Sequence, residues 1–297
     1  MPAQTPDELN HHFGIDEHIA FHQGPGEFPF VSLTTSHGTA EVCLYGAHLT
    51  SWIPTGAAEV IWTSPDAIYL TGKAIRGGIP VCWPRFADQD TPYDIPAHGV
   101  ARTSLWEVTS TSADAPEAKI TLKLPSCESL PAFDLQLIIT VSKKLHLELT
   151  TTNLSEQPFT ITQALHTYLN VGDIDQVEIS GLDEVRYHDK MDDYQEKIQT
   201  GNITFDKAFD SIYEGTSSDI LLHDKSLDRT IKVTKAGSDT TVIWNPWKEA
   251  AEKMADMPDN GYQNMVCIEA ANAGEETITL HPNEKHSLGT QISLETE

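Results

Sequence analysis

The sequence predicts an all-β fold, namely one large antiparallel sandwich of many strands with few short helices. Apolar and polar residues alternate with a period of two along much of the chain, which is typical of strands with one buried face. These segments follow one another at spacings of about ten residues and are joined by Gly, Pro, Asn and Asp. Long helical patterns do not separate them, so antiparallel pairing is favoured over parallel pairing.

The alternating segments run from the early part of the chain to its C-terminal region. Each segment places its apolar residues on one face of a strand, as LHLELTTTN does at 145–153. The predicted strands are 58–62, 119–124, 135–141, 145–153, 159–169, 176–182, 230–235, 241–244 and 276–280.

Two short segments predict helices. Thr5 and Pro6 stand before DELNHHF, and a threonine N-cap followed by proline is a common helix start. The segment KEAAEKMA at 248–255 is rich in residues of high helix propensity. Because no linker, composition break or repeat divides the chain, we expect a single domain over residues 1–297, with about the first 25 residues at its periphery.

The charge of the chain limits its partners. The formal net charge is −25, from 44 acidic and 19 basic residues. Nucleic acids and anionic membranes are bound by basic surfaces, so we expect neither as a partner. The same charge favours a monomer, since identical acidic surfaces repel one another.

Targeting signals and cysteine spacing point to the cytoplasm. The chain has no apolar run of about 18 residues and no signal-peptide pattern at its N-terminus. Four cysteines lie far apart without a CxxC pair, so we expect reduced thiols and a cytoplasmic protein. They are Cys43, Cys82, Cys127 and Cys267.

Three of the five arginines, Arg76, Arg85 and Arg102, lie in one loop-rich segment, 76–102. Arginine suits bidentate contact with phosphate or carboxylate, and Gly77–Gly78 beside Arg76 could let backbone approach a ligand closely. The alternative is that these arginines pair on the surface with nearby aspartates, Asp88, Asp90 and Asp94.

Two histidines and one carboxylate are candidates for proton transfer. His98 stands in the same loop segment, and His166 would share a strand face with Thr162, Ala164 and Tyr168. Glu269 would share a face with Met265 and Cys267, where a plain solvent-facing carboxylate is unusual. Each histidine could equally be a loop or cross-strand residue without a role.

Other chemistry finds little support in the sequence. The aromatic pair in WNPW at 244–247 could stack on a sugar or simply pack in the core. No metal-binding, acyl-transfer, nucleotide-phosphate or dinucleotide motif occurs, so the sequence gives no support for a metal site or for these chemistries.

Seven segments, taken together and in this order, resemble the D-hexose-6-phosphate mutarotases (glucose-6-phosphate 1-epimerases) of the aldose 1-epimerase superfamily. The resemblance covers roughly residues 35–290. The matching segments are RGGIPVCWP (76–84), PAHGVARTSLWEV (96–108), ALHTYLNVGDI (164–174), VEISGLDEVRYHDK (177–190), FDSIY (209–213), WNPW (244–247) and NMVCIEAANAG (264–274).

The resemblance implies a β-supersandwich of the galactose mutarotase type, a small sugar phosphate as substrate, and no need for a metal or an organic cofactor. His166 and Glu269 would match the family's catalytic histidine and glutamate, and His98 a second active-site histidine. Basic and acidic substrate-binding residues would be matched by Arg76, Arg102 and Asp210. Arg85 is additional, and could join the phosphate site or pair with Asp88.

The expected reaction exchanges α and β anomers through an open-chain aldehyde. Glu269 would act as the base on O1 and need only be ionised, while His166 would act as the acid with little tuning of its pKa. A mutarotase for unphosphorylated aldoses, a glycoside hydrolase and a non-catalytic sugar-binding protein remain alternatives.

Overall fold

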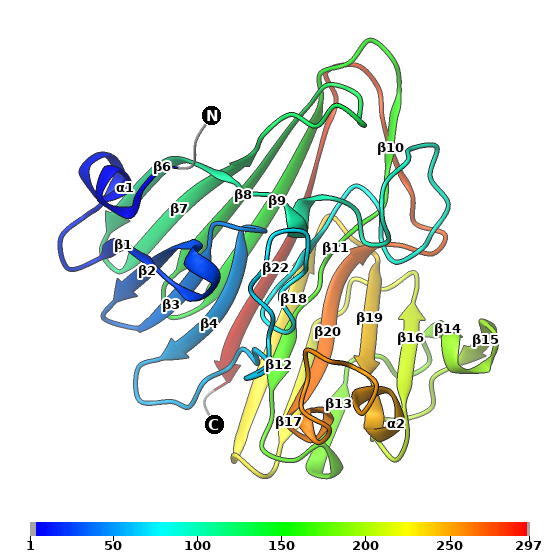
Figure 1. Cartoon of the computed structure of the whole chain (residues 1–297). Coiled ribbons are helices and arrows are strands. Elements are labelled where there is room, and N and C mark those ends of the chain that lie inside the picture. Colours follow the sequence, from blue (N-terminus) through cyan, green and yellow to red (C-terminus); the bar gives the residue numbers. More distant parts are fainter. Residues whose placement is uncertain (1–3, 296–297) are drawn as a thin grey trace.

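The computed structural model describes residues 4–295, and strands dominate the architecture (Figure 1). The pairings between its strands are antiparallel, as the absence of intervening helical patterns predicted. Two large sheets and a four-stranded sheet pack face to face, so the predicted all-β sandwich is confirmed.

The longest strands form an eight-stranded sheet through the middle of the molecule (Figure 1). In its strand β9, Leu145, Leu147 and Leu149 are fully buried, and the residues between them are partly exposed. In order across the sheet the strands are β13 (Val177–Ser180), β17 (Ile220–Asp224), β18 (Arg229–Ala236), β22 (Lys285–Glu295), β9 (Leu145–Asn153), β8 (Phe133–Val141), β7 (Glu117–Leu124) and β6 (Glu107–Asp114).

A second eight-stranded sheet packs against the first through β20. Every residue of β20 is buried, with Val266 and Ile268 in the main core and Met265 and Cys267 in a smaller cluster on the opposite face. The strands in order are β15 (Gln195–Ile198), β14 (Arg186–Asp189), β16 (Phe209–Tyr213), β19 (Thr240–Asn245), β20 (Met265–Asn272), β11 (Gln163–Leu165) and β5 (Val81–Cys82), while β12 (Tyr168–Asn170) also pairs with β20.

The N-terminal strands form the four-stranded sheet that covers another part of the first sheet (Figure 1). The first 25 residues, expected at the periphery, provide its edge strand, and Leu9, Ile19 and Phe21 are nonetheless buried in the core. The strands are β1 (Ile19–Gln23), β2 (Pro29–Thr35), β3 (Gly38–Cys43) and β4 (His48–Pro54).

Both predicted helices are present. In α1 (Pro6–Phe13) the Thr5 side chain accepts from the Glu8 backbone, and the Glu8 carboxylate accepts from the Thr5 backbone. Helix α2 (Trp247–Ala251) is shorter than the predicted 248–255. None of the described helices is long and apolar enough to cross a membrane. Short 3₁₀ turns lie at Pro25–Glu27, Ala101–Thr103, Ile174–Gln176, Lys190–Asp192 and Gly261–Asn264.

Two strand predictions were wrong. Residues 58–62 form no strand, because their only ladder contact is a bridge between Ile61 and Leu169. The segment 159–169 is three strands rather than one, since the backbone N–H groups of Thr162 and His166 donate to carbonyls of residues 84 and 80. Its first part, β10 (Phe159–Ile161), pairs with β21 (Ile278–Leu280). All four cysteines are free, as their spacing predicted.

Candidate active site

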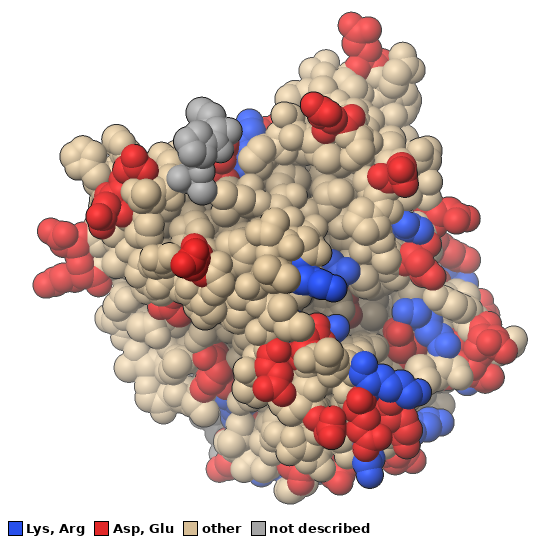
Figure 2. All heavy atoms as spheres, viewed as in Figure 1, with Lys and Arg blue, Asp and Glu red and all other residues tan. Residues whose placement is uncertain are grey.

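A cavity of about 290 Å³ opens beside the second eight-stranded sheet. All the side chains predicted for the site line this one cavity, although they are spread over almost two hundred residues of sequence (roughly the length of a large domain). They are Arg76, His98, Arg102, His166, Asp210 and Glu269. On the face shown in Figure 2, Lys and Arg atoms gather around a hollow in a surface that is otherwise rich in acidic groups.

His166 and Glu269 lie side by side at the base of the cavity. His166 stands in the break between β11 and β12, and its backbone N–H donates to the carbonyl of Pro80. Glu269 is on β20, and its Oε1 lies 3.5 Å from His166 Nε2. The other polar atoms of the pair, His166 Nδ1 and Glu269 Oε2, are buried without a hydrogen-bond partner among the described residues. Buried polar atoms are usually hydrogen-bonded, and a catalytic role is one explanation for those that are not.

The pKa values of the pair are shifted more than the sequence analysis expected, since it gave His166 little tuning and needed Glu269 only to be ionised. Burial raises the pKa of Glu269 well above its ordinary value, and the Asp210 carboxylate raises it further. Burial lowers the pKa of His166 well below its ordinary value, and nearby positive charges, Arg102 and Arg76 among them, add to the effect. Burial thus acts on both groups in favour of their neutral forms, an imidazole beside a carboxylic acid. This state holds the same number of protons as imidazolium beside carboxylate.

His98 lies next to this pair, on a loop with left-handed backbone at φ 61°. Its ring centroid is 5.9 Å from that of His166, and its Nδ1 accepts a hydrogen bond from the Ala87 backbone. Burial, assisted by Arg102, lowers the pKa of His98 to about 3. His98 is therefore neutral near pH 7, and its Nε2 carries the proton.

Arg76 faces the cavity but is already held on two sides. Its Nε lies 3.2 Å from Asp256 Oδ1, and one terminal nitrogen donates to the Tyr168 hydroxyl over 3.2 Å. Neither partner was predicted from sequence, because both lie far from Arg76 along the chain. None of the three arginines pairs with the carboxylate of Asp88, Asp90 or Asp94 in the structure, so that alternative is not supported.

Arg102 and Arg85 have different surroundings. Arg102 lines the cavity and donates to the carbonyl of Ala97, without an ion pair to a described carboxylate. Arg85 does not line the cavity. Its guanidinium donates to the backbone carbonyls of Asp88, Gln89 and Ile95 and so braces the 85–95 loop.

Asp210 is paired with a lysine that sequence reasoning did not single out. Lys190 Nζ lies 2.8 Å from Asp210 Oδ2, and both residues line the cavity. Burial raises the pKa of Asp210 although the Lys190 ammonium opposes this rise. Lys190 could have been noticed as the last residue of the segment 177–190, but its pairing depends on how β14 and β16 align.

The glycine pair beside Arg76 serves the fold rather than a ligand. A Cβ on Gly77 would lie 2.5 Å from the backbone of Thr63, and one on Gly78 would lie 2.3 Å from His48 Nε2. Both glycines have left-handed backbone, with φ of 90° and 67°. His48 is fully buried, and its Nε2 donates a hydrogen bond to the Gly77 carbonyl. This contact fixes the backbone next to Arg76.

Aromatic rings form the remaining wall. The ring of Tyr168 stacks on that of His166 with centroids 4.9 Å apart, and Trp244 meets His166 edge-on. Trp244 lines the cavity, whereas Trp247 packs against Tyr262 away from it. Trp247 thus belongs to the packing of the fold, whereas Trp244 is accessible from the cavity.

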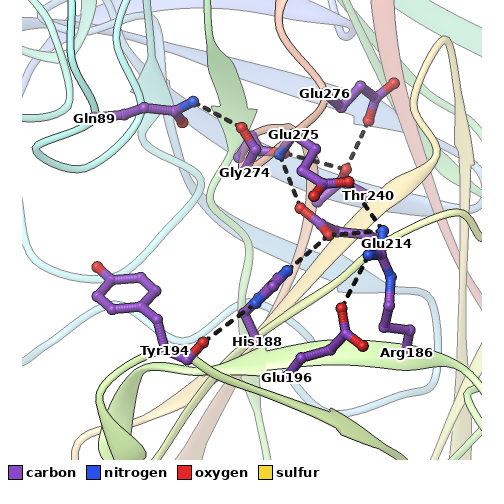
Figure 3. A network of polar contacts seen from close by, with 11 residues as sticks. Gln89, Arg186, His188, Tyr194, Glu196, Glu214, Thr240, Gly274, Glu275 and Glu276 are labelled. Carbon is purple, nitrogen blue, oxygen red and sulfur yellow. Dashed lines mark hydrogen bonds and ion pairs between the residues drawn. The ribbon is translucent and has the colours of Figure 1, made fainter.

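A polar network, shown in Figure 3, supports the strand that precedes Lys190. The Glu214 side chain is only 5% exposed, and its Oε2 lies 3.1 Å from His188 Nε2 and 3.3 Å from Arg186. Its Oε1 accepts from the Glu275 backbone over 2.9 Å. Glu214 thereby joins β14, β16 and the turn after β20, and it holds the edge of the sheet beside the cavity.

Two groups of three side chains have the spacing of metal ligands among the described residues. The first is His166, Cys267 and Glu269, where burial raises the pKa of the Cys267 thiol and so disfavours the thiolate that metals bind. The second is His188, Glu214 and Glu275, where the guanidinium of Arg186 already contacts both carboxylates. Neither group favours a resident metal.

Comparison with known proteins agrees with this geometry. The family model described as aldose 1-epimerase matches residues 29–293. The chain belongs to the aldose 1-epimerase family. Among the family's members, a protein of Escherichia coli (strain K12) named "Putative glucose-6-phosphate 1-epimerase" is 39% identical over 242 residues, covering 80% of each chain.

Solved structures share the fold of this family member. The crystal structure of a "putative mutarotase" from Salmonella typhimurium has a TM-score of 0.88 at 32% identity and covers 96% of each chain. A galactose mutarotase related enzyme from Lactobacillus acidophilus has a TM-score of 0.69 at 15% identity, over 89% of this chain and 97% of that one. The galactose mutarotase-like fold expected from the sequence is thus confirmed.

Proposed function

We propose that this protein is a mutarotase that interconverts the α and β anomers of a hexose 6-phosphate, with glucose 6-phosphate the first substrate to test. The observation that carries the proposal is the buried pair of His166 and Glu269, whose Nδ1 and Oε2 have no described hydrogen-bond partner. The pair shares a cavity with Arg76 and Arg102, which suit a phosphate. Membership of the aldose 1-epimerase family and the printed name of the Escherichia coli relative support the same reading.

The reaction needs two proton transfers at one sugar ring. In the opening step the carboxylate of Glu269 accepts the proton of the O1 hydroxyl, the bond between C1 and the ring oxygen breaks, and the imidazolium of His166 protonates that oxygen. The step leaves a protonated Glu269 and a neutral His166, which is the state that burial favours. Closure on the other face of the aldehyde reverses the transfers. Each group is expected to contribute about 10²–10⁴-fold.

The remaining residues orient the substrate in this proposal. Asp210 with Lys190 binds sugar hydroxyls, and the neutral His98 donates from Nε2 toward O1. The Trp244 and Tyr168 rings offer apolar faces to the C–H surface of the sugar. A phosphate carries about −1.5 to −2 charges at pH 7, and the arginines hold it away from the reacting carbon.

Exchange NMR on the anomeric protons of glucose 6-phosphate tests the proposal. We expect the wild-type protein to accelerate α/β exchange more for glucose 6-phosphate than for glucose, and His166→Ala and Glu269→Ala each to lose at least about 100-fold. Acceleration of glucose alone would indicate an unphosphorylated aldose as substrate. No acceleration of either sugar, with binding retained, would indicate a sugar-binding protein instead.

A further inference from the structure

The imidazole ring of His166 has no short hydrogen bond to fix its orientation. Its Nδ1 is buried without a partner among residues 4–295, and its Nε2 lies 3.5 Å from Glu269 Oε1. That distance is longer than the upper end of about 3.2 Å usual for hydrogen bonds from nitrogen to oxygen. Histidines that transfer protons are ordinarily oriented by a hydrogen bond at the second ring nitrogen. Another contact must therefore fix the plane of this ring.

Among the described residues, the aromatic ring nearest to this imidazole is that of Tyr168. The rings of Tyr168 and His166 are almost parallel, at 12°, with centroids 4.9 Å apart. The rings of His98 and Trp244 lie farther from it, at 5.9 and 6.0 Å, and are inclined by 53° and 81°. Rotation of the imidazole about its Cβ–Cγ bond would press its edge into the stacked phenol ring. The stack therefore restrains this rotation.

Tyr168 is itself fixed on several sides. Its strand, β12, pairs with β20, which carries Glu269. The Tyr168 backbone donates to the Gly78 carbonyl and accepts from the Trp62 backbone, both over 3.0 Å. Its side-chain hydroxyl accepts from Arg76 over 3.2 Å, and the residue is only 2% exposed. A side chain that is locked in this way can serve as a rigid support for its neighbour.

We propose that Tyr168 is the positioning residue of His166, and that its stacked ring keeps Nε2 directed toward Glu269 and the ring oxygen of the sugar. The inference rests on the proposed function. Proton transfer needs donor and acceptor within hydrogen-bond reach, and a displacement of about 1 Å can lower a rate about 100-fold. Because the ring of Tyr168 contacts His166 and its hydroxyl contacts Arg76, the two contacts can be removed one at a time.

Two substitutions separate the ring from the hydroxyl. Tyr168→Phe keeps the stacked ring and removes only the acceptor of Arg76, whereas Tyr168→Leu removes the stack as well. We expect Tyr168→Leu to lower kcat for α/β exchange about 10- to 100-fold with both glucose 6-phosphate and glucose, while the KM for glucose changes less than about threefold. Tyr168→Phe should keep kcat within about threefold of wild type.

Tyr262→Leu is the matched control. Tyr262 packs against the same small apolar cluster as Tyr168, but its ring lies against Trp247 and does not line the cavity. The same change of tyrosine to leucine should there leave kcat within about twofold of wild type for both sugars. Urea unfolding of both leucine variants gives their stability, so that each rate refers to folded protein.

A second readout does not depend on activity. In protein labelled with ¹³C at histidine, relaxation of the Cε1–H group of His166 reports how rigid the ring is on the picosecond to nanosecond timescale. The signal is assigned by its loss in His166→Ala. We expect a rigid ring in wild type and in Tyr168→Phe, and a lower order parameter in Tyr168→Leu.

Each result decides for or against the proposal. An unchanged kcat in Tyr168→Leu would overturn it, and so would an equal loss in Tyr262→Leu, which would indicate general loosening of the cluster. If Tyr168→Phe were as slow as Tyr168→Leu, the effect would belong to the contact with Arg76 and not to the stack. A wild-type protein that accelerates neither sugar would overturn the proposed function, whereas the order parameter of His166 would still decide whether Tyr168 fixes its ring.

Discussion

Asp256 Oδ1 lies 3.2 Å from the Nε of Arg76, across 180 residues of sequence. The arginine matched to phosphate binding thus faces the cavity with its own counter-ion beside it. The arrangement fixes the guanidinium in place, and it also puts a negative charge near the proposed phosphate. Asp256 therefore orients the Arg76 guanidinium but weakens the electrostatic attraction of the cavity for a phosphate.

Replacing this carboxylate with an amide separates the two effects. Asp256→Asn keeps an oxygen that accepts from Arg76 Nε but removes the negative charge. We expect the KM for glucose 6-phosphate to fall about two- to threefold, because partly exposed charges interact weakly, while the KM for glucose stays within error. Steady-state exchange rates measure both values. A higher KM for the phosphorylated sugar alone would show that the charge on Asp256 matters more for orientation.

Arg102 and Arg85 should differ in their effect on selectivity. Arg102→Ala removes a cation that lines the cavity, so the KM for glucose 6-phosphate should rise at least about tenfold more than that for glucose. Arg85→Ala removes a brace of the 85–95 loop and should lower stability without changing this selectivity. Equal effects of Arg102→Ala on both sugars would contradict a phosphate site at this position.

The buried carboxylate of Glu214 is expected to be a major contributor to stability. Glu214→Ala removes the shared partner of Arg186 and His188 and the acceptor of the Glu275 backbone N–H. Because Arg186 is 40% exposed and keeps Glu196 and Glu275 as partners, we expect the free energy of unfolding to fall by about 1–3 kcal/mol. Urea unfolding measures the loss. Glu196→Ala, which removes an exposed partner of the same arginine, is the control and should cost less than about 1 kcal/mol.

Gly274 lies against the Glu214 carboxylate, so a substitution at Gly274 tests the same polar network. A Cβ at this position would lie 2.1 Å from Glu214 Oε1, and the backbone has a φ of 66°. Gly274→Ala should therefore displace the Glu214 carboxylate and lower the free energy of unfolding by about 1–3 kcal/mol. A change below about 0.5 kcal/mol would mean that the network in Figure 3 can rearrange freely.

Acid should destabilise the fold through its buried histidines. Burial lowers the pKa of His48 to about 4, and burial with Arg102 lowers that of His98 to about 3, both from 6.5. Below pH 6.5 the unfolded chain binds protons that the folded chain does not, so this stability is lost as pH falls toward the folded pKa values. Each histidine should contribute a slope of about 1.4 kcal/mol per pH unit between those limits.

Urea unfolding at a series of pH values between 7 and about 4.5 checks this dependence. His48→Asn removes one titrating group, so its free energy of unfolding should decline less steeply with falling pH than that of wild type. An unchanged slope would mean that His48 becomes protonated without unfolding, through access of water to its site.

The sequence determined the fold class because period-two alternation is a local property. Strands such as β9 have one face of leucines, and this pattern identified them with nearly the right boundaries. Where alternation is absent, prediction failed for a physical reason. All four residues of β14 are partly exposed, so no apolar face marked the strand that precedes Lys190.

The seven segments of the family resemblance likewise identified candidate residues that share one cavity. These segments contain the side chains of the site together with backbone constraints such as those at Gly77–Gly78. Which charges are compensated could not be read from the sequence. The pairings of Arg76 with Asp256 and Lys190 with Asp210 depend on strand register and loop packing, which bring distant residues within hydrogen-bond distance. Only the tertiary structure, by burying His166 beside Glu269, decided that the pKa of the imidazole is lowered and that of the carboxyl raised.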